Sequence, residues 1–299
     1  MLTRCLLALA LMLPGFAAAE NVSLKHQGLT LNANLEMAPG KSMKDGVILM
    51  THGTLAHGRM EIMAALQETM KARGYNSLSI NLSYANDNRA YAMYDCAQPH
   101  AHKHEDAVGE IGAWVDWLKT KGAAKIAVLG HSRGGNQTAW YAAGKPDAAV
   151  NAVILIAPGS WTADYLAKDY RSRFGQELGP VLAKARAAVK AGKGASPLAK
   201  TGVVYCKDAQ TTAASLVSYH GFDPRMETFK LLGKIRPPVL VIAGSADETT
   251  PGVAEKAKPH ADGKHVSLVG IEGADHFFRD LYADEAADAI GDFLKKQAF

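Results

Sequence analysis

The sequence predicts an α/β fold in which helices cover both faces of a mostly parallel central sheet. Short and continuously apolar stretches recur along the chain, at residues 47–50, 126–129, 152–157 and 239–243. Stretches with apolar residues at helical spacing lie between several of them. Strands that alternate with helices form parallel sheets, and strands that are apolar throughout are typical of sheets buried on both faces.

The predicted elements follow from these two periods and from the glycines and prolines that end them. Alternating residues around Gly28 indicate a hairpin, and Gly74 ends the first helical pattern. A long polar stretch over residues 83–104 is predicted to be a loop. In order, the sequence predicts a hairpin at 21–37, strands at 47–50, 77–82, 126–129, 152–157, 239–243 and 266–269, and helices at 59–73, 105–119, 136–143, 253–257 and 283–297.

The first 19 residues predict a secretory signal peptide. Arg4 precedes an apolar run over residues 5–13, a Pro-Gly pair and a small-residue end at Ala19. The run is shorter than the roughly 20 apolar residues that span a bilayer. A retained N-terminal anchor is the alternative. We therefore expect an exported protein, periplasmic or secreted, without stable membrane insertion after cleavage.

Composition limits the remaining choices. The chain has 299 residues, of which 48% are hydrophobic and 21% charged, so it can bury a substantial core. The formal net charge is +4, and Lys and Arg are scattered without a dense basic run, which argues against nucleic-acid binding. After cleavage, Cys96 and Cys206 remain. In an oxidising compartment they form either one disulfide or two buried thiols, and the sequence leaves both open.

The segment Gly130-His-Ser132-Arg-Gly134 carries the strongest chemical signal. An apolar strand precedes it and a helical pattern follows at once. Such a sharp turn forces Ser132 into a strained conformation, which flanking glycines permit because they lack a Cβ. This arrangement is typical of an exposed serine nucleophile, and a purely structural turn is the alternative.

Other polar residues follow neighbouring strands. His52-Gly53 comes after residues 47–50, Asp247 after 239–243 and His276 after 266–269. Because the carboxyl ends of parallel strands meet at one edge of a sheet, we expect these side chains to lie near Ser132. A serine hydroxyl needs a base within hydrogen-bond reach and an acid that orients the base.

In this order, Ser132, Asp247 and His276 resemble the triad of the α/β-hydrolase superfamily, and the resemblance covers essentially the whole mature chain. It implies that Ser132 attacks a carbonyl carbon, that His276 is the base and that Asp247 orients it. It also implies that the backbone N–H groups of Thr54 and Arg133 form the oxyanion hole. The loop-supporting residues would be His52, Gly53, Gly130 and Gly134.

Each assignment has an alternative. Asp247 could be a turn residue, with Glu248 as the acid, whereas Asp275 is too near His276 in sequence to orient it well. The Arg133 side chain is either solvated or binds a substrate carboxylate or phosphate. His100, His102 and His104 invite a metal site, but no closed ligand set is visible, so we expect a polar loop and neither metal nor cofactor.

Residues 161–234 interrupt the strand–helix alternation where the superfamily inserts a lid. Their largely helical pattern predicts a helical cap on a core formed by residues 20–160 and 235–299, and a plain structural insertion is the alternative. The sequence thus predicts an exported serine hydrolase that cleaves a small carboxylic ester, or a thioester or amide, through an acyl-serine. An acyltransferase with the same triad and a non-catalytic binding protein are the rivals. No protein partner is indicated.

Overall fold

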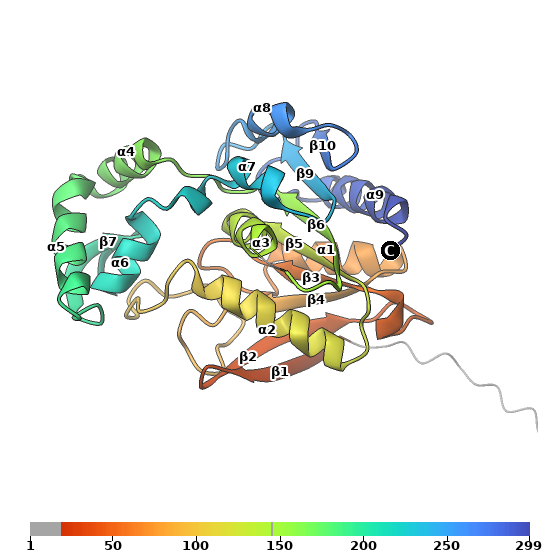
Figure 1. Ribbon diagram of the computed structural model, residues 1–299, viewed down its shortest axis with the longest axis horizontal. Coiled ribbons are helices and arrows are strands. Elements are labelled where there is room, and N and C mark those ends of the chain that lie inside the picture. Colours follow the sequence, from red (N-terminus) through yellow and green to blue (C-terminus); the bar gives the residue numbers. More distant parts are fainter. Residues whose placement is uncertain (1–18, 145) are drawn as a thin grey trace, which may run out of the picture.

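An eight-stranded sheet forms the centre of the computed structural model, which describes residues 19–144 and 146–299 (Figure 1). Its spatial order is β1-β2-β4-β3-β5-β6-β9-β10. The β1–β2 and β2–β4 pairs are antiparallel, and all others are parallel, which confirms the predicted mostly parallel sheet. The strands are β1 (Glu20–His26), β2 (Leu29–Glu36), β3 (Val47–Thr51), β4 (Asn76–Asn81), β5 (Ile126–His131), β6 (Val150–Ile156), β9 (Val239–Gly244) and β10 (Val266–Ile271).

Helices cover both faces of this sheet, as the sequence predicts. Along β3, Leu49 points to a core built with Trp114, whereas Met50 points to a second core built with Met63 and Ile290. Neighbouring residues of a strand face opposite sides, so these two cores lie on opposite faces. One face carries α1 (Glu61–Ala72) and α9 (Leu281–Lys296), and the other carries α2 (Asp106–Thr120), α3 (Arg133–Ala143) and α8 (Val253–Ala257).

Most of residues 161–234, here called the insertion, lies to one side of the sheet with a hydrophobic core of its own around Leu166, Tyr170 and Leu216 (Figure 1). The last residues of the insertion lie over the sheet, where Phe229 and Leu232 pack into the same core as Trp114. The insertion is not wholly helical, because an antiparallel pair of strands stands between its helices. The sequence did not predict these strands, since the exposed first strand mixes Lys, Thr and Gly and lacks a clear apolar alternation. The elements are α4 (Ala163–Phe174), α5 (Leu178–Lys190), β7 (Pro197–Val203), β8 (Cys206–Thr212), α6 (Ala213–His220), η2 (Pro224–Met226), α7 (Thr228–Leu231) and η3 (Leu232–Lys234).

The polar segment 83–104 contains no helix or strand of its own, and it packs against the insertion. Cys96 and Cys206 are joined by a disulfide at the start of β8. The His100 N–H donates to the Gln210 carbonyl at 2.7 Å, and the Thr212 N–H donates to the His100 carbonyl at 2.9 Å. One covalent and two backbone links therefore hold this loop against β8.

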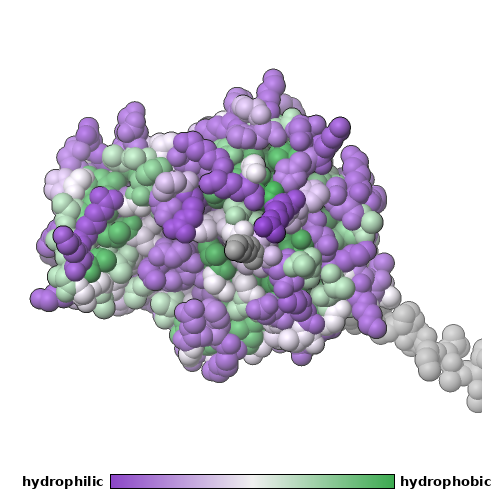
Figure 2. Space-filling view, in the orientation of Figure 1, coloured by the Kyte–Doolittle hydropathy of each residue, from purple (hydrophilic) through white to green (hydrophobic). Residues whose placement is uncertain are grey.

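Hydrophilic residues cover most of the face shown in Figure 2, and hydrophobic residues show through in small separate patches. Within residues 19–144 and 146–299, no helix combines the length and the apolar character needed to cross a membrane. The predicted signal peptide lies outside the described residues except for Ala19.

Candidate active site

Ser132 occupies the turn between β5 and α3 with φ 57° and ψ −123°, a conformation that non-glycine residues rarely adopt. The flanking glycines permit this turn by close approach. A Cβ on Gly130 would lie 2.2 Å from the Gly134 carbonyl oxygen, and a Cβ on Gly134 would lie 2.3 Å from the His52 carbonyl oxygen. Any larger residue at either position would push β5, α3 and the loop after β3 apart. The local sequence thus lifts the Ser132 hydroxyl above the sheet edge.

The structure brings the three residues of the predicted triad together. His276 Nε2 lies 2.9 Å from Ser132 Oγ, and His276 Nδ1 lies 2.9 Å from Asp247 Oδ2. Ser132 follows β5, Asp247 follows β9 and His276 follows β10, so the parallel sheet delivers all three to one edge. All three residues are buried, which shields this hydrogen-bonded chain from bulk water.

Asp247 is held as an acceptor for His276. The backbone N–H groups of Thr249 and Thr250 donate to its Oδ1 at 2.8 and 2.9 Å, and Thr250 Oγ1 donates to Oδ2 at 2.6 Å. Burial opposes ionisation of Asp247, but hydrogen bonds from His276 and Thr250 outweigh it and lower the pKa to about 2. The carboxylate is therefore ionised at neutral pH and keeps a proton on His276 Nδ1.

The two other acids near the triad face elsewhere. Glu248 is exposed, and Asp275 accepts hydrogen bonds from the Phe277 N–H and from Arg279 at 2.9 and 3.0 Å. Asp247 is accordingly the carboxylate placed against the imidazole of His276.

His131 is a site residue that the sequence interpretation did not single out. Its Nε2–H donates to the backbone carbonyl of His276 at 2.8 Å, so it supports the loop that carries the imidazole. Burial, together with the nearby His276, lowers the pKa of His131 to about 3, so this ring is neutral. His131 occupies a variable position of the Gly-x-Ser-x-Gly pattern, so the sequence around it does not indicate a role. Its position beside His276 follows from the fold alone.

The loop after β3 reaches the serine through Gly53, where an added Cβ would lie 3.2 Å from Ser132 Cβ. His52 holds this loop: its Nε2 accepts from the Leu82 N–H at 3.1 Å, which leaves Nδ1–H to donate to the Gly53 carbonyl at 3.0 Å. Arg133 starts α3, where backbone N–H groups have no partner within the helix. Thr54 and Arg133, the expected oxyanion donors, both border the cavity at Ser132.

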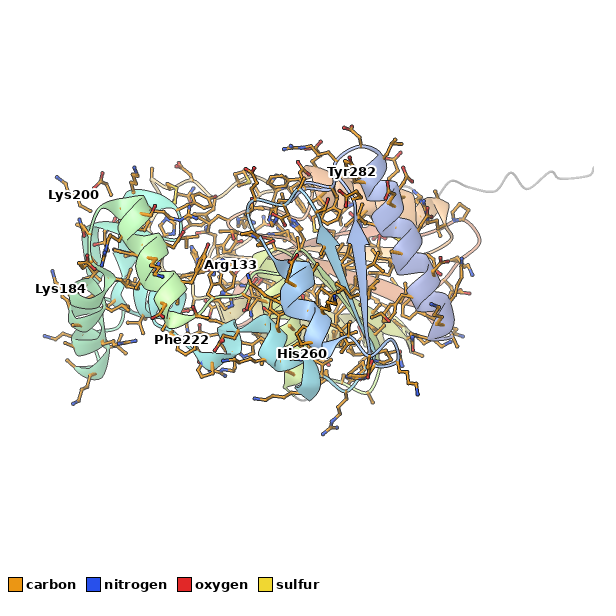
Figure 3. All side chains as sticks on the ribbon, turned by 90° about the horizontal axis from the view of Figure 1, so that it is seen from above. Arg133, Lys184, Lys200, Phe222, His260 and Tyr282 are labelled. Carbon is orange, nitrogen blue, oxygen red and sulfur yellow. A yellow bond between two sulfur atoms is a disulfide. The ribbon has the colours of Figure 1, made fainter. Side chains whose placement is uncertain are left out.

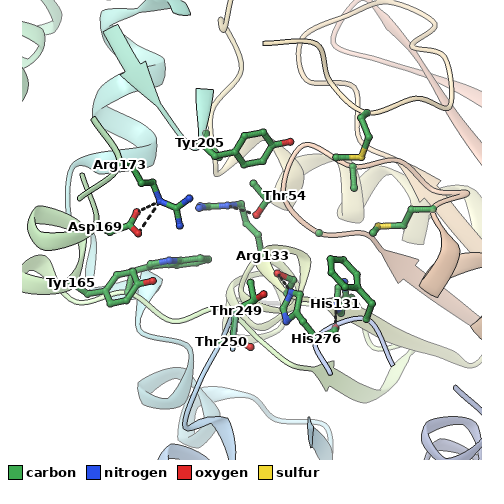
Figure 4. Close-up of a pocket in the computed structure, with 18 residues that line it drawn as sticks. Thr54, His131, Arg133, Tyr165, Asp169, Arg173, Tyr205, Thr249, Thr250 and His276 are labelled. Atoms are coloured by element: carbon green, nitrogen blue, oxygen red, sulfur yellow. Dashed lines mark hydrogen bonds and ion pairs between the residues drawn. The ribbon is translucent and has the colours of Figure 1, made fainter. Parts of the chain in front are cut away.

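A cavity of about 330 Å³ opens above Ser132 and His276, between the core and the insertion (Figure 4). The loops after β3, β9 and β10 line its core side, and Trp161, α4 and the β7–β8 turn line the other. Exposed Met93, Tyr165 and Tyr205 stand at its border. The lining residues are Gly53, Thr54, Ala56, Met60, Met93, His131, Ser132, Arg133, Trp161, Tyr165, Asp169, Arg173, Val204, Tyr205, Thr249, Thr250, His276 and Phe277.

The three histidines of the 83–104 loop are buried in a network of hydrogen bonds. His102 Nδ1 lies 2.8 Å from the Tyr219 hydroxyl, and His102 Nε2 lies 3.2 Å from His100 Nδ1. His104 Nδ1 accepts from Arg133 at 3.1 Å, so its Nε2–H donates to Asn136 Oδ1 at 2.8 Å. In the described part of the chain, no group of three or more His, Cys, Asp or Glu residues is placed to hold a metal ion.

The sheet order and the strand-to-helix turn at Ser132 define the class of this protein, the α/β hydrolases. Within that class, a family model described as "Serine aminopeptidase, S33" matches residues 42–279, and the chain belongs to this family.

Solved structures with the same fold include a lipase, an esterase and other hydrolases. Est1E from Butyrivibrio proteoclasticus is 20% identical at a TM-score of 0.63, with 93% of this chain and 98% of that one covered. The monoacylglycerol lipase from Paleococcus ferrophilus is 18% identical at a TM-score of 0.60, with 89% of this chain and 99% of that one covered. The Pyrococcus furiosus esterase PF2001 is 16% identical at a TM-score of 0.59, with 93% of this chain and 91% of that one covered. No curated protein matches the chain.

Proposed function

We propose that this chain is an exported serine hydrolase that cleaves a carboxylic ester through an acyl-serine intermediate. One observation carries the proposal: Ser132 Oγ, His276 and Asp247 form a continuous hydrogen-bonded chain that opens on a cavity. The strained turn at Ser132 also supports it, because such strain is kept where the surrounding structure and a function require it.

In the proposed reaction, His276 Nε2 takes the Ser132 proton while Oγ attacks the ester carbonyl carbon. The backbone N–H groups of Thr54 and Arg133 donate to the oxyanion that forms; losing one such donor typically costs about 2.7–4 kcal/mol. The tetrahedral intermediate collapses as His276 returns the proton to the leaving alcohol. Water then attacks the acyl-serine with His276 again as base, which releases the acid and restores the serine.

The charge of the cavity favours an ester over a peptide with a free N-terminus. A terminal ammonium group calls for an unpaired carboxylate in the site. Asp169 is the acidic residue among those that line the cavity. Both of its carboxylate oxygens already accept a hydrogen bond from Arg173 Nε at 2.8 Å. Thioesters and simple amides would follow the same chemistry as esters.

Export and a capping role of the insertion belong to the same proposal. The predicted signal peptide supports export, and the Cys96–Cys206 disulfide fits an oxidising compartment. The insertion contributes Trp161, Tyr165 and Arg173 to the cavity wall, so we assign it the part of a cap that selects the substrate.

Labelling with a fluorophosphonate probe tests the nucleophile. We expect wild-type protein to be labelled, Ser132→Ala to remain unlabelled, and Ser23→Ala, which changes an exposed serine on β1, to be labelled like wild type. Hydrolysis of chromogenic esters of varied acyl length should follow the same pattern. Equal labelling of the Ser132→Ala protein would show that the nucleophile is another residue.

A further inference from the structure

Two arginines share the cavity with Ser132. Arg133 directly follows the serine at the start of α3, and Arg173 comes from α4 of the insertion. Figure 4 shows the two guanidinium groups next to each other in this view, near Thr54 and Tyr205. Figure 3 shows Arg133 at the junction between the core and the insertion; the labels Lys184 and Lys200 lie on the insertion. Two positive charges near each other repel, and an anion bound between them offsets this repulsion.

Arg133 is held in place by neutral groups. Its Nε donates to Thr54 Oγ1 at 3.2 Å, its terminal nitrogen donates to His104 Nδ1 at 3.1 Å, and its guanidinium lies 4.2 Å from the centre of the Trp161 ring. Burial, with the nearby charge of Arg133, lowers the pKa of His104 to about 3, so this histidine adds no charge. Within residues 19–144 and 146–299, no carboxylate forms an ion pair with Arg133. Its charge is thus held beside the serine without a directly paired carboxylate.

Arg173 offers the second half of an anion site. Its Nε donates to both carboxylate oxygens of Asp169, and within the described part of the chain its two terminal nitrogens form no hydrogen bond. With His131 neutral, the lining residues Arg133, Arg173 and Asp169 sum to one net positive charge. A substrate with one negative charge would neutralise the cavity.

The remaining wall is mostly apolar or aromatic. Met60, Met93, Val204 and Phe277 line the cavity in addition to the aromatic rings of the insertion. This wall suits the hydrocarbon part of a substrate, and the two arginines suit a planar acid group, because a guanidinium donates two parallel hydrogen bonds to a carboxylate. Since Arg133 adjoins Ser132 in the chain, the acid group has to lie within one side chain's length of the ester carbonyl.

We propose that the substrate is a half-ester of a short dicarboxylic acid, whose free carboxylate binds between Arg133 and Arg173 while its ester carbonyl meets Ser132. This substrate class rests on the proposed serine hydrolase function. Arg173 is a specificity-determining residue in this arrangement, and Asp169 orients it. Neutral esters of the same length lack the charge-assisted contacts and react more slowly.

Two alkyl esters with five-carbon acyl groups test the proposal, monoethyl glutarate with a free carboxylate and neutral ethyl valerate. We expect wild type to show a kcat/KM at least about tenfold higher for monoethyl glutarate, as a charge-assisted hydrogen bond allows. Arg173→Gln should reduce this ratio about tenfold or more, and added salt should reduce it in wild type. Arg171→Gln is the matched control, because Arg171 lies on the same helix and pairs with Glu177 outside the cavity. This control should keep the wild-type ratio.

A wild-type ratio near one, or a ratio that Arg173→Gln leaves unchanged, would overturn the substrate class while ester hydrolysis itself stands. A binding experiment separates this from failure of the proposed function. Calorimetry on the Ser132→Ala protein should detect monoethyl glutarate, with affinity about tenfold weaker when Arg173→Gln is added. Absence of binding, or binding that is indifferent to Arg173, would refute the anion site whether or not the wild-type protein hydrolyses esters.

Discussion

Arg133 Nε donates to Thr54 Oγ1 at 3.2 Å, so a side chain joins the two residues whose backbone N–H groups we assign to the oxyanion hole. The bond connects the first turn of α3 to the loop after β3. It therefore fixes the distance between these two segments at the point where the developing negative charge would lie.

Thr54→Val removes this acceptor and keeps the shape of the side chain. Because the loop and α3 lose their link, we expect kcat to fall about five- to tenfold, in keeping with the about 1–1.5 kcal/mol that a single intramolecular hydrogen bond contributes. Steady-state ester hydrolysis measures the effect. Thr54→Ser keeps the hydroxyl and should retain most of the activity; an equal loss in both variants would contradict a role for the bond.

Asp247→Asn tests the acid of the triad. The amide cannot hold the proton on His276 Nδ1 in the way that the ionised carboxylate does, so we expect kcat to fall about 10⁴-fold. Glu248→Gln changes an exposed neighbour and should leave kcat unaltered. Single-turnover hydrolysis can quantify both proteins, and a large loss in Glu248→Gln instead would reassign the acid.

His131 is expected to position the loop of His276 through the hydrogen bond to its carbonyl. His131→Ala removes the donor, and we expect kcat to drop about tenfold with a smaller change in KM. His131→Gln carries an amide N–H near the position of Nε2 and should recover part of the loss. If the glutamine variant is no better than alanine, the ring acts through packing rather than through this bond.

Glu110 should make the stability depend on pH. Burial raises its pKa to about 7 despite hydrogen bonds from Ser83, whose N–H and hydroxyl lie 2.9 and 2.6 Å from its carboxyl oxygens. The unfolded carboxyl titrates near pH 4.3, so between about pH 4.3 and 7 the folded state binds more protons. The free energy of unfolding therefore decreases as the pH rises through this window and levels off above it.

Urea unfolding at pH 5 and pH 8 checks this prediction. The free energy of unfolding should differ between the two pH values by about 2–3 kcal/mol less in Glu110→Gln than in wild type, since one pKa unit corresponds to about 1.4 kcal/mol. Glu272→Gln alters an exposed carboxyl and should keep the wild-type pH dependence. The same pH dependence in Glu110→Gln and wild type would mean that Glu110 does not titrate in this window.

The disulfide between Cys96 and Cys206 closes a loop with a sequence separation of 110 residues. Cross-links of such loops typically add about 2–5 kcal/mol. Cys96→Ser with Cys206→Ser should lower the thermal midpoint and raise KM, because the disulfide ties the loop bearing Met93 to the turn bearing Tyr205 at the cavity border. With a reductant, the thermal midpoint of wild type should approach that of the double variant. A midpoint that the reductant leaves unchanged would refute the contribution of the disulfide to stability.

Local patterns account for much of the fold and of the site. The glycines around Ser132 are required by contacts within a few residues and with the adjacent loop, and the continuously apolar strands are buried in the interior of the sheet. Parallel strands deliver their carboxyl ends to one edge, which is why residues as distant in the chain as Ser132 and His276 were predicted to meet. The antiparallel strands of the insertion lacked such a pattern and were missed.

By itself, then, the sequence determined the parallel sheet, the strained turn at Ser132 and the set of residues at the sheet edge, because the period of apolar residues and the absence of a glycine Cβ act locally. Tertiary structure decided which groups face one another. The placement of Arg133 and Arg173 in one cavity and the joining of Cys96 to Cys206 depend on how the insertion and the 83–104 loop pack on the core. The bond from His131 to His276 depends on how the loops after two separate strands meet. Such contacts between distant segments leave no periodic trace in a single chain.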